Sequence, residues 1–179
     1  MTITSGFPAQ EPYDMATIRL DDRDLQILQI LAREGRITKA DLAKRVNLSP
    51  TPCWERLKRL EKSGVVCSYH AEVDLQKIAP HLTIFVMLEL DQHKAETFQV
   101  FERMIQRFDE ITACWAIGGG FDYFLQVVTP DTQSYQVLID ELLSARIGIS
   151  RYFTYVVIKP VKQAAKLPFA VLLGRDPSD

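Results

Sequence analysis

The sequence predicts an α+β protein made of two parts, a helical part followed by a part in which strands and helices alternate. Two observations lead to this prediction. Between residues 20 and 64, apolar residues recur at the spacing of helices in three consecutive stretches with short connections. After Gly64 the period changes, and the later stretches follow the order β-α-β-β-α-β.

The first two helices are predicted from apolar periodicity and from their capping residues. The stretch LDDRDLQILQILAREGR has leucine and isoleucine at helical spacing, with acidic residues at the start, where they favour the positive end of the helix dipole. Gly35 is expected to end this helix. In TKADLAKRVNL, Thr38 can cap a second helix, and Asp41 gives a short capping box. This helix is expected to run to about Val46.

The third helix is predicted to begin within the stretch SPTPCWERLKRLEKSGV. Ser49 is a good N-cap residue, and Pro50 and Pro52 then fall at the first and third helical positions. Both positions precede the first obligatory intrahelical N–H bond, so neither proline removes a hydrogen bond. The prolines are therefore expected to start the helix, which should end at Gly64.

The third helix has an apolar face and a charged face. Cys53, Leu57 and Leu60 fall at i, i+4 and i+7 and are expected to pack on the first two helices. The residues expected to face away are Thr51, Pro52, Glu55, Arg56 and Arg59. Residues 36–62 include eight basic and three acidic side chains, a net charge of +5. This concentration indicates a polyanionic partner, although a solvated helix face can carry the same charge.

A wing is predicted directly after the third helix. VVCSYHAEVD alternates between two faces, which is typical of a strand or a wing hairpin. Trp54 can brace the third helix against this wing or touch DNA, and the bracing role is the more common one. Three tightly connected helices, the third rich in Arg and Lys, followed by such a wing, describe a winged helix-turn-helix over residues 19–73. In such domains the third helix lies in the major groove of DNA, and its N-terminal residues reach base edges.

The residues expected to contact double-stranded DNA lie on or beside the third helix. Arg56 can form a bidentate pair with a guanine edge. Lys58, Arg59 and Lys62 are expected to neutralise phosphates. Glu55 can accept a hydrogen bond from a cytosine N4 or pair with Arg59 at i+4. The full predicted set is Ser49, Thr51, Pro52, Glu55, Arg56, Lys58, Arg59 and Lys62.

Residues 82–162 are predicted to form a ferredoxin-like domain. LTIFVMLEL, ITACWAIGGGFDYFLQVVT and ISRYFTYVVIKPV supply four strands, and KAETFQVFERMIQRF and DTQSYQVLIDELLSA supply two amphipathic helices. This order closes into a four-stranded antiparallel sheet with both helices on one face. The first and last strands have apolar residues on both faces, so a second copy of the chain is expected to cover the open face.

The remaining segments are predicted to be connections and ends: residues 1–18 a flexible arm, 74–81 a hinge and 163–179 a C-terminal tail. No apolar run approaches the roughly 20 residues that span a bilayer, and the N-terminal stretch lacks the pattern of a secretion signal. Three cysteines without a CxxC pair fit a reducing compartment. A cytoplasmic protein with no membrane partner is therefore expected.

The stretch AIGGGFDY joins two predicted strands and has two interpretations. A triple glycine can serve only as a turn, because glycine adopts positive φ without steric cost, or it can let a ligand approach the backbone closely. It is not a phosphate-binding loop, since no Gly-Lys-Ser/Thr follows and no helix begins there.

The helical part resembles the DNA-binding half of the Lrp/AsnC (leucine-responsive/asparagine) family of transcription regulators. The resemblance rests on the LDxxDxxIL opening, the GRIT step, the DLAxxVxLS second helix and SPTPCWERLKRLEKSGVV. The second part resembles the same family's effector-binding and oligomerisation domain, so the resemblance covers roughly residues 20–161. It implies a regulator that binds pseudo-palindromic DNA as a dimer or a higher even-numbered oligomer and responds to a small amino-acid-like effector.

The resemblance also implies an effector site near the glycine stretch. In the family a Gly-x-x-Asp turn at this place lies near the effector pocket between dimers, and Gly119 and Asp122 match it. Asp122 can bind an effector ammonium or can simply stabilise the turn, and Arg146 is a candidate carboxylate clamp. The candidate effector-binding residues are Trp115, Gly118, Gly119, Gly120, Asp122, Tyr123 and Arg146.

Two other classes of protein were weighed against a DNA-binding regulator. An enzyme is not expected, because His70, His81 and His93 lack the spacing of metal ligands and none lies beside a cysteine in a nucleophilic pattern. No catalytic residue, metal or cofactor is therefore predicted. The alternative is a ligand-sensing interaction module whose helix-turn-helix binds protein rather than DNA. DNA binding would weaken steeply with salt, which separates these two possibilities.

Overall fold

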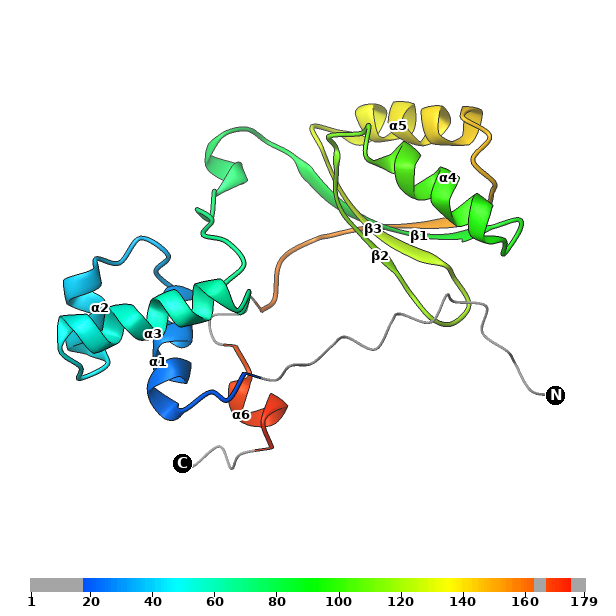
Figure 1. Cartoon of the computed structure of the whole chain (residues 1–179). Helices are drawn as coiled ribbons and strands as arrows, with labels where there is room; N and C mark the ends of the chain where they lie inside the picture. Colours follow the sequence, from blue (N-terminus) through cyan, green and yellow to red (C-terminus); the bar gives the residue numbers. More distant parts are fainter. Residues whose placement is uncertain (1–17, 163–166, 175–179) are drawn as a thin grey trace. The chain divides into compact units, whose positions relative to one another are not determined.

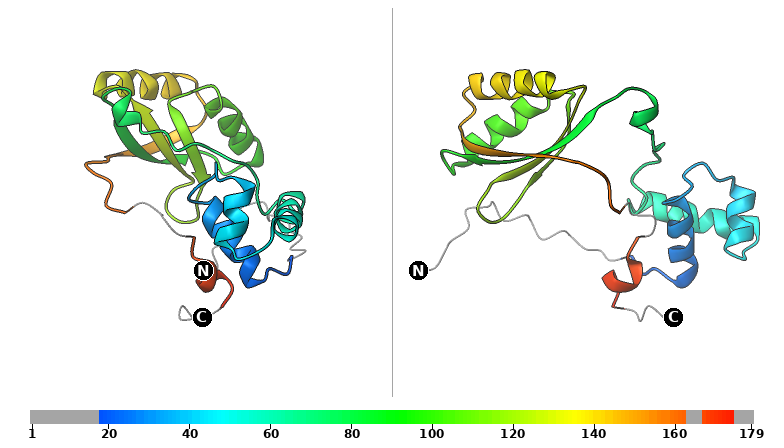
Figure 2. Two further views of the ribbon diagram at one scale, coloured as in Figure 1. Left: turned by 90° about the vertical axis from the view of Figure 1, so that its left-hand side faces the viewer. Right: turned by 180° about the vertical axis from the view of Figure 1, so that it is seen from behind.

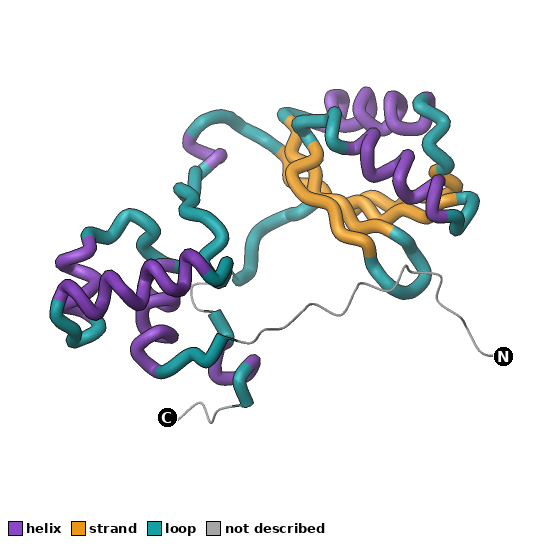
Figure 3. The backbone as a smooth tube through the Cα atoms, in the orientation of Figure 1, coloured by secondary structure: helices purple, strands orange, loops and turns teal. Residues whose placement is uncertain are grey.

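The computed structural model describes residues 18–162 and 167–174, so the predicted N-terminal arm lies almost entirely outside the described residues. The described chain forms two compact units (Figures 1 and 3). The helix-turn-helix unit contains residues 18–73 and the described residues from 161 onward, and the ferredoxin-like unit contains residues 74–160. No helix among the described residues is long and apolar enough to cross a membrane.

The helix-turn-helix unit contains α1 (Asp22–Leu31), α2 (Lys39–Arg45) and α3 (Pro50–Lys62). Thr38 caps α2 by accepting a hydrogen bond from the Asp41 N–H, as predicted. The prediction that Gly35 ends α1 is wrong, because the helix ends at Leu31. The N–H of Glu34 still donates to the carbonyl of Ile30, and Gly35 lacks the positive φ of a glycine cap.

The predicted start and end of α3 are confirmed. Ser49 is the N-cap residue, Pro50 is the first helical residue, and Gly64 follows the helix with φ +75°. The hydroxyl of Ser49 makes no capping hydrogen bond with the described residues. A serine cap bonds the N–H of the second or third helical residue, and Pro52, at the third position, has no N–H to donate.

The predicted inner face of α3 is also confirmed. Cys53, Leu57 and Leu60 are buried and pack with apolar residues of α1 and α2, including Ile27 and Leu42. Burial raises the pKa of the Cys53 thiol, which therefore serves as a small apolar side chain.

The predicted wing strand is not observed. Residues 67–74 have no regular secondary structure, and the side chains of residues 67–80 are all exposed (Figure 3). Their alternating sequence therefore does not correspond to a buried face, and alternation alone cannot form a strand without a hydrogen-bonded partner. Within the predicted hinge, Leu75–Lys77 forms a single turn of 3₁₀ helix.

The ferredoxin-like unit has the predicted β-α-β-β-α-β order. Its elements are β1 (Leu82–Leu90), α4 (Ala95–Ile105), β2 (Ile111–Ala116), β3 (Tyr123–Thr129), α5 (Thr132–Ser144) and β4 (Ile149–Val156). The strands form one antiparallel sheet in the order β2-β3-β1-β4. Both helices cover the same face of this sheet, as Figures 1 and 2 show.

The two faces of the sheet differ in burial. The face under the helices is a closed core whose buried members include Val86, Leu125 and Phe101. The opposite face is rich in aromatic side chains: Phe85 stacks on Phe124 with ring centroids 5.0 Å apart, while other aromatic residues there are exposed. The exposed members with the largest rings are Trp115, Phe153 and Tyr155. A short helix, α6 (Phe169–Leu172), follows in the predicted tail.

Candidate DNA-binding surface and effector site

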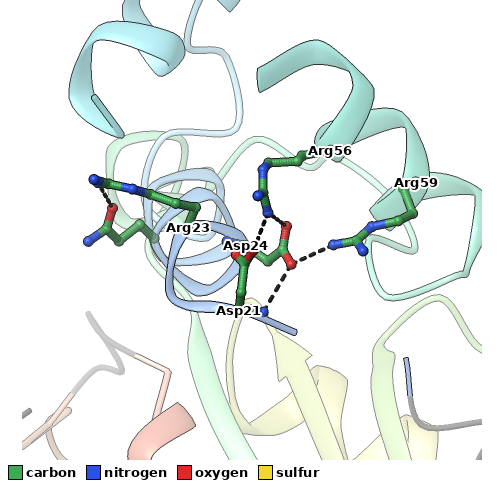
Figure 4. Close-up of polar contacts among 6 residues, drawn as sticks. Asp21, Arg23, Asp24, Arg56 and Arg59 are labelled. Atoms are coloured by element: carbon green, nitrogen blue, oxygen red, sulfur yellow. Dashed lines mark hydrogen bonds and ion pairs between the residues drawn. The ribbon is translucent and has the colours of Figure 1, made fainter. Parts of the chain in front are cut away.

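Two arginines of α3 bind the N-terminus of α1 (Figure 4). The Nη1 atom of Arg56 donates to Asp21 at 2.6 Å and to Asp24 at 3.0 Å. The Nη2 atom of Arg59 donates to the other oxygen of Asp24 at 2.5 Å. The prediction that Arg56 faces away from the domain is therefore wrong, whereas Arg59 is exposed as predicted but directs its guanidinium to Asp24. A helical wheel gives the direction of Cα–Cβ, but the long arginine stem can carry its charge back over the helix surface.

Asp24 is the centre of this network. It is fully buried, and its carboxylate also accepts the N–H of Asp21, which completes a capping box with the hydrogen bond from the Asp24 N–H to Asp21. Buried carboxylates are tolerated when charged donors satisfy them, and Arg56 and Arg59 supply these donors. The Asp24 N–H and the Arg56 guanidinium hold the pKa of Asp21 below its ordinary value of 3.8.

Other residues of the predicted DNA-binding set are open to solvent. Lys58 and Lys62 are exposed and make no ion pair with the described residues, and Glu55 makes none with Arg59, which instead binds Asp24. Pro52 is half-buried. The members that are both exposed and without an ion pair to the described residues, which we call the α3 front, are Ser49, Thr51, Glu55, Lys58 and Lys62.

Trp54 braces α3, but not against a wing. Its half-buried indole packs on the core of the helix-turn-helix unit, and the ammonium of Lys39 lies 3.3 Å from the ring centroid. Lys39 is the first residue of α2, so this cation–π contact joins the start of α2 to α3. The predicted bracing role of Trp54 is therefore correct, but its partner is the core and α2 rather than a wing.

Asp122 follows the glycine turn, and its buried carboxylate stabilises the end of the sheet. Oδ2 accepts a hydrogen bond of 2.7 Å from the N–H of Leu90, and Oδ1 lies 3.1 Å from Nε2 of His93. The backbone of Asp122 also donates to the carbonyl of Leu88 and accepts the N–H of Ile117. An effector ammonium at this carboxylate would share Oδ1 with the exposed His93 imidazole.

The three glycines before Asp122 present open backbone. Only Gly119 has positive φ, +137°, and a Cβ on Gly118, Gly119 or Gly120 would meet no atom within 4 Å. Their N–H groups donate to no described residue. The turn therefore requires glycine at one position, and its N–H groups can receive an anion.

The remaining candidate effector residues differ in their surroundings. Trp115 is exposed on the open face of the sheet. Tyr123 is 2% exposed, its ring lies in the core under the helices, and its hydroxyl donates to Glu102. Burial and the Glu102 contact raise the pKa of Tyr123. Arg146 is exposed after α5, in the loop whose Gly148 carbonyl accepts the N–H that follows β1.

Sequence reasoning missed three residues of these sites. Asp21 and Asp24 were read as favourable charges at a helix start, although their i, i+3 spacing is also that of a capping box. His93 was considered only as a metal ligand and rejected. No local signal places His93 beside Asp122, because that contact depends on how β1 pairs with β3.

The fold and the exposed front of α3 define a DNA-binding transcription regulator with a second, ferredoxin-like domain. Two family models agree: "Winged helix-turn-helix DNA-binding" matches residues 20–66, and "Lrp/AsnC ligand binding domain" matches residues 83–167. The chain belongs to the Lrp/AsnC family of DNA-binding transcription regulators, whose second domain binds amino acids.

Two transcription regulators with similar sequences support this membership. The transcriptional regulatory protein DoeX of Halomonas elongata is 47% identical over 146 residues, which cover 82% of this chain and 92% of the relative. The leucine-responsive regulatory protein of Escherichia coli is 38% identical over 148 residues, 83% of this chain and 90% of that protein.

Solved structures have the same fold. An AsnC family regulator from Agrobacterium tumefaciens matches with a TM-score of 0.79 and 31% identity, over 86% of this chain and 99% of that one. The regulator NMB0573 from Neisseria meningitidis, solved as a complex with L-Met, matches with a TM-score of 0.80 and 30% identity, again over 86% and 99%.

Proposed function

We propose that this regulator binds pseudo-palindromic double-stranded DNA through the α3 front, as a dimer or a higher even-numbered oligomer, and that an amino acid bound near Asp122 changes its assembly. The proposed DNA binding rests on one observation, namely that two of the cations on α3 are paired with carboxylates and two are not. The carboxylates of Asp21 and Asp24 neutralise the two arginines, Arg56 and Arg59. The two lysines, Lys58 and Lys62, are exposed and unpaired among the described residues.

This division assigns different roles to the two pairs. Thr51 and Glu55, near the start of α3, reach base edges, because the N-terminal residues of a recognition helix enter the groove. Lys58 and Lys62 neutralise phosphates. Arg56 and its neighbour Arg59 hold α3 on α1, a role that replaces the expectation that Arg56 reads a guanine.

Removing both exposed lysines is expected to weaken DNA binding without changing sequence preference. The double variant Lys58→Ala/Lys62→Ala should lose about two phosphate contacts, so the slope of log K against log salt should become shallower by about 1.8. Lys44→Ala is the control, because Lys44 is an exposed lysine of α2, 3.9 Å from Asp41. Fluorescence anisotropy with operator and random duplexes at several salt concentrations gives both quantities.

The same titration tests the alternative in which the helix-turn-helix binds protein. Weak duplex binding by the unsubstituted protein that does not vary with salt would favour the alternative. An unchanged salt slope in the double lysine variant would contradict the roles given to Lys58 and Lys62.

The open face of the sheet supports the proposed dimer. Aromatic residues of all four strands of the sheet form one continuous apolar surface there, and a monomer rarely exposes such a surface. Phe153 is 43% exposed on this face, while Val137 is 61% exposed on α5, in the layer that covers the other face.

A lysine on the open face is expected to separate the dimer. Phe153→Lys places an unpaired charge where a second sheet would pack, so the mass measured by light scattering after size exclusion should fall to half at micromolar concentration. Val137→Lys makes the same change on α5 and should leave the mass unchanged. Dissociation by Val137→Lys alone would place the interface on the helices instead.

The effector is proposed to be an amino acid, with its carboxylate at the N–H groups of the glycine turn and its ammonium at Asp122. The open backbone of that turn and the solved L-Met complex of a relative support this class of ligand. The protein is further proposed to be a DNA-binding regulator without catalytic activity that acts in the cytoplasm.

A further inference from the structure

The predicted C-terminal tail contacts the helix-turn-helix unit. The side chain of Phe169, at the start of α6, packs against the apolar core of that unit. The Nε2 atom of Gln29 on α1 donates a hydrogen bond of 2.6 Å to the carbonyl of Leu167. Figures 1 and 2 show α6 beside α1. The chain therefore leaves the ferredoxin-like unit after Pro160, and residues 167–174 belong to the unit that contains its first helix.

The contact leaves the α3 front open. Phe169 and Leu167 line a groove of about 400 Å³ together with Leu28 and Leu31 of α1 and Val66 after α3. None of the α3 front residues lines this groove. The tail is therefore compatible with DNA binding. Helix α6 also lies beyond the residues matched by the ligand-binding family model, which end at 167.

The contact gives the two units a second and shorter connection. The first runs from Val66, which packs on the helix-turn-helix core, to Leu82 at the start of β1, and it spans at most about 55 Å when extended. The second runs from Val157, whose N–H donates to the sheet, to Leu167, whose carbonyl accepts a hydrogen bond from Gln29 of α1. This connection spans at most about 35 Å when extended. A bound tail thus sets the tighter limit on the separation of the units.

We propose that residues Leu167–Leu173, the docking segment, bind α1 so that the helix-turn-helix unit is connected to the ferredoxin-like unit at both of its ends. In the dimer this double connection restricts the distance between the two α3 helices. Binding is intramolecular, so a small contact is sufficient at an effective concentration on the order of millimolar. Two helix-turn-helix units match half-sites about one DNA turn apart, and the docking segment narrows the range of half-site spacings that they can bind.

Hydrogen–deuterium exchange on the full chain tests the contact without reference to DNA. Phe169→Ala removes the half-buried ring that packs on the core, and the backbone amides of residues 28–34 and 167–173 should then exchange several-fold faster than in the unsubstituted protein. Val171→Ala is the matched control, since Val171 lies on the same helix but is 75% exposed. Equal exchange in the unsubstituted protein and the Phe169→Ala variant would overturn the proposal.

The consequence for DNA rests on the proposed dimer and is tested with duplexes whose half-site spacing varies in single base pairs. The unsubstituted protein should bind one spacing at least tenfold more tightly than spacings a few base pairs away. Phe169→Ala and a chain ending at Lys166 should bind these spacings within about threefold of one another, with unchanged affinity for a single half-site. Identical spacing profiles for all three proteins would overturn the inference. If no protein binds any duplex, the proposed function fails, while the exchange experiment still decides whether the segment docks.

Discussion

Replacing Asp24 with alanine is expected to destabilise the helix-turn-helix unit by about 2–4 kcal/mol, more than any other single change to its polar residues. Asp24 is fully buried and accepts hydrogen bonds from Arg56, Arg59 and the N–H of Asp21. Its removal leaves Arg59 without its carboxylate and leaves Arg56 with Asp21 alone. The Arg56 and Arg59 side chains are 30% and 47% exposed, so water recovers part of the loss, and the cost is smaller than for a fully buried pair.

Urea unfolding of the helix-turn-helix unit can be followed by tryptophan fluorescence in a Trp115→Phe background, because Trp54 is then the sole tryptophan of the sequence and reports on this unit. Glu55→Ala is the control, an exposed carboxylate of α3 that makes no ion pair with the described residues. Its loss should change the free energy of unfolding by only a few tenths of a kcal/mol, roughly the effect of an ordinary surface substitution. If the two variants unfold at the same urea concentration, Asp24 does not hold α3 on α1.

Replacing Asp122 is expected to separate two roles of one carboxylate. Asp122→Ala leaves the buried N–H of Leu90 without its acceptor and should lower the free energy of unfolding of the ferredoxin-like unit by about 1–3 kcal/mol. Asp122→Asn keeps a carbonyl oxygen for Leu90 but removes the charge that an effector ammonium needs. The asparagine variant should therefore remain nearly as stable as the unsubstituted protein while losing its response to the effector.

A thermal-shift screen against amino acids, L-methionine among them, measures the response, since a ligand that binds only the folded protein raises its melting temperature. The unsubstituted protein should respond to at least one amino acid, and Asp122→Asn should not respond to it. If the Asp122→Asn variant keeps the full rise in melting temperature, the carboxylate serves only to join the end of β1 to the start of β3. Effector-free DNA binding by this variant should be unchanged.

Most of the fold follows from local sequence patterns. The three helices, their apolar faces and the proline-rich start of α3 depend on periodicity and capping within a few residues, and the structure confirms each of them. The order of strands and helices in the second part was sufficient for the ferredoxin-like sheet. The prediction of a wing strand was wrong, because an alternating sequence forms a strand only where a second strand and a core are available to it.

The sequence by itself determined which segments form helices and strands, where α3 begins and ends, and the family to which the regulator belongs. Only the tertiary structure decided which cations of α3 are free of a carboxylate partner, because Arg56 and Arg59 bind a carboxylate more than thirty residues away. It likewise brought His93 to Asp122 and the docking segment to α1. Charge and periodicity are local properties, whereas the partner of a long charged side chain depends on how distant segments pack.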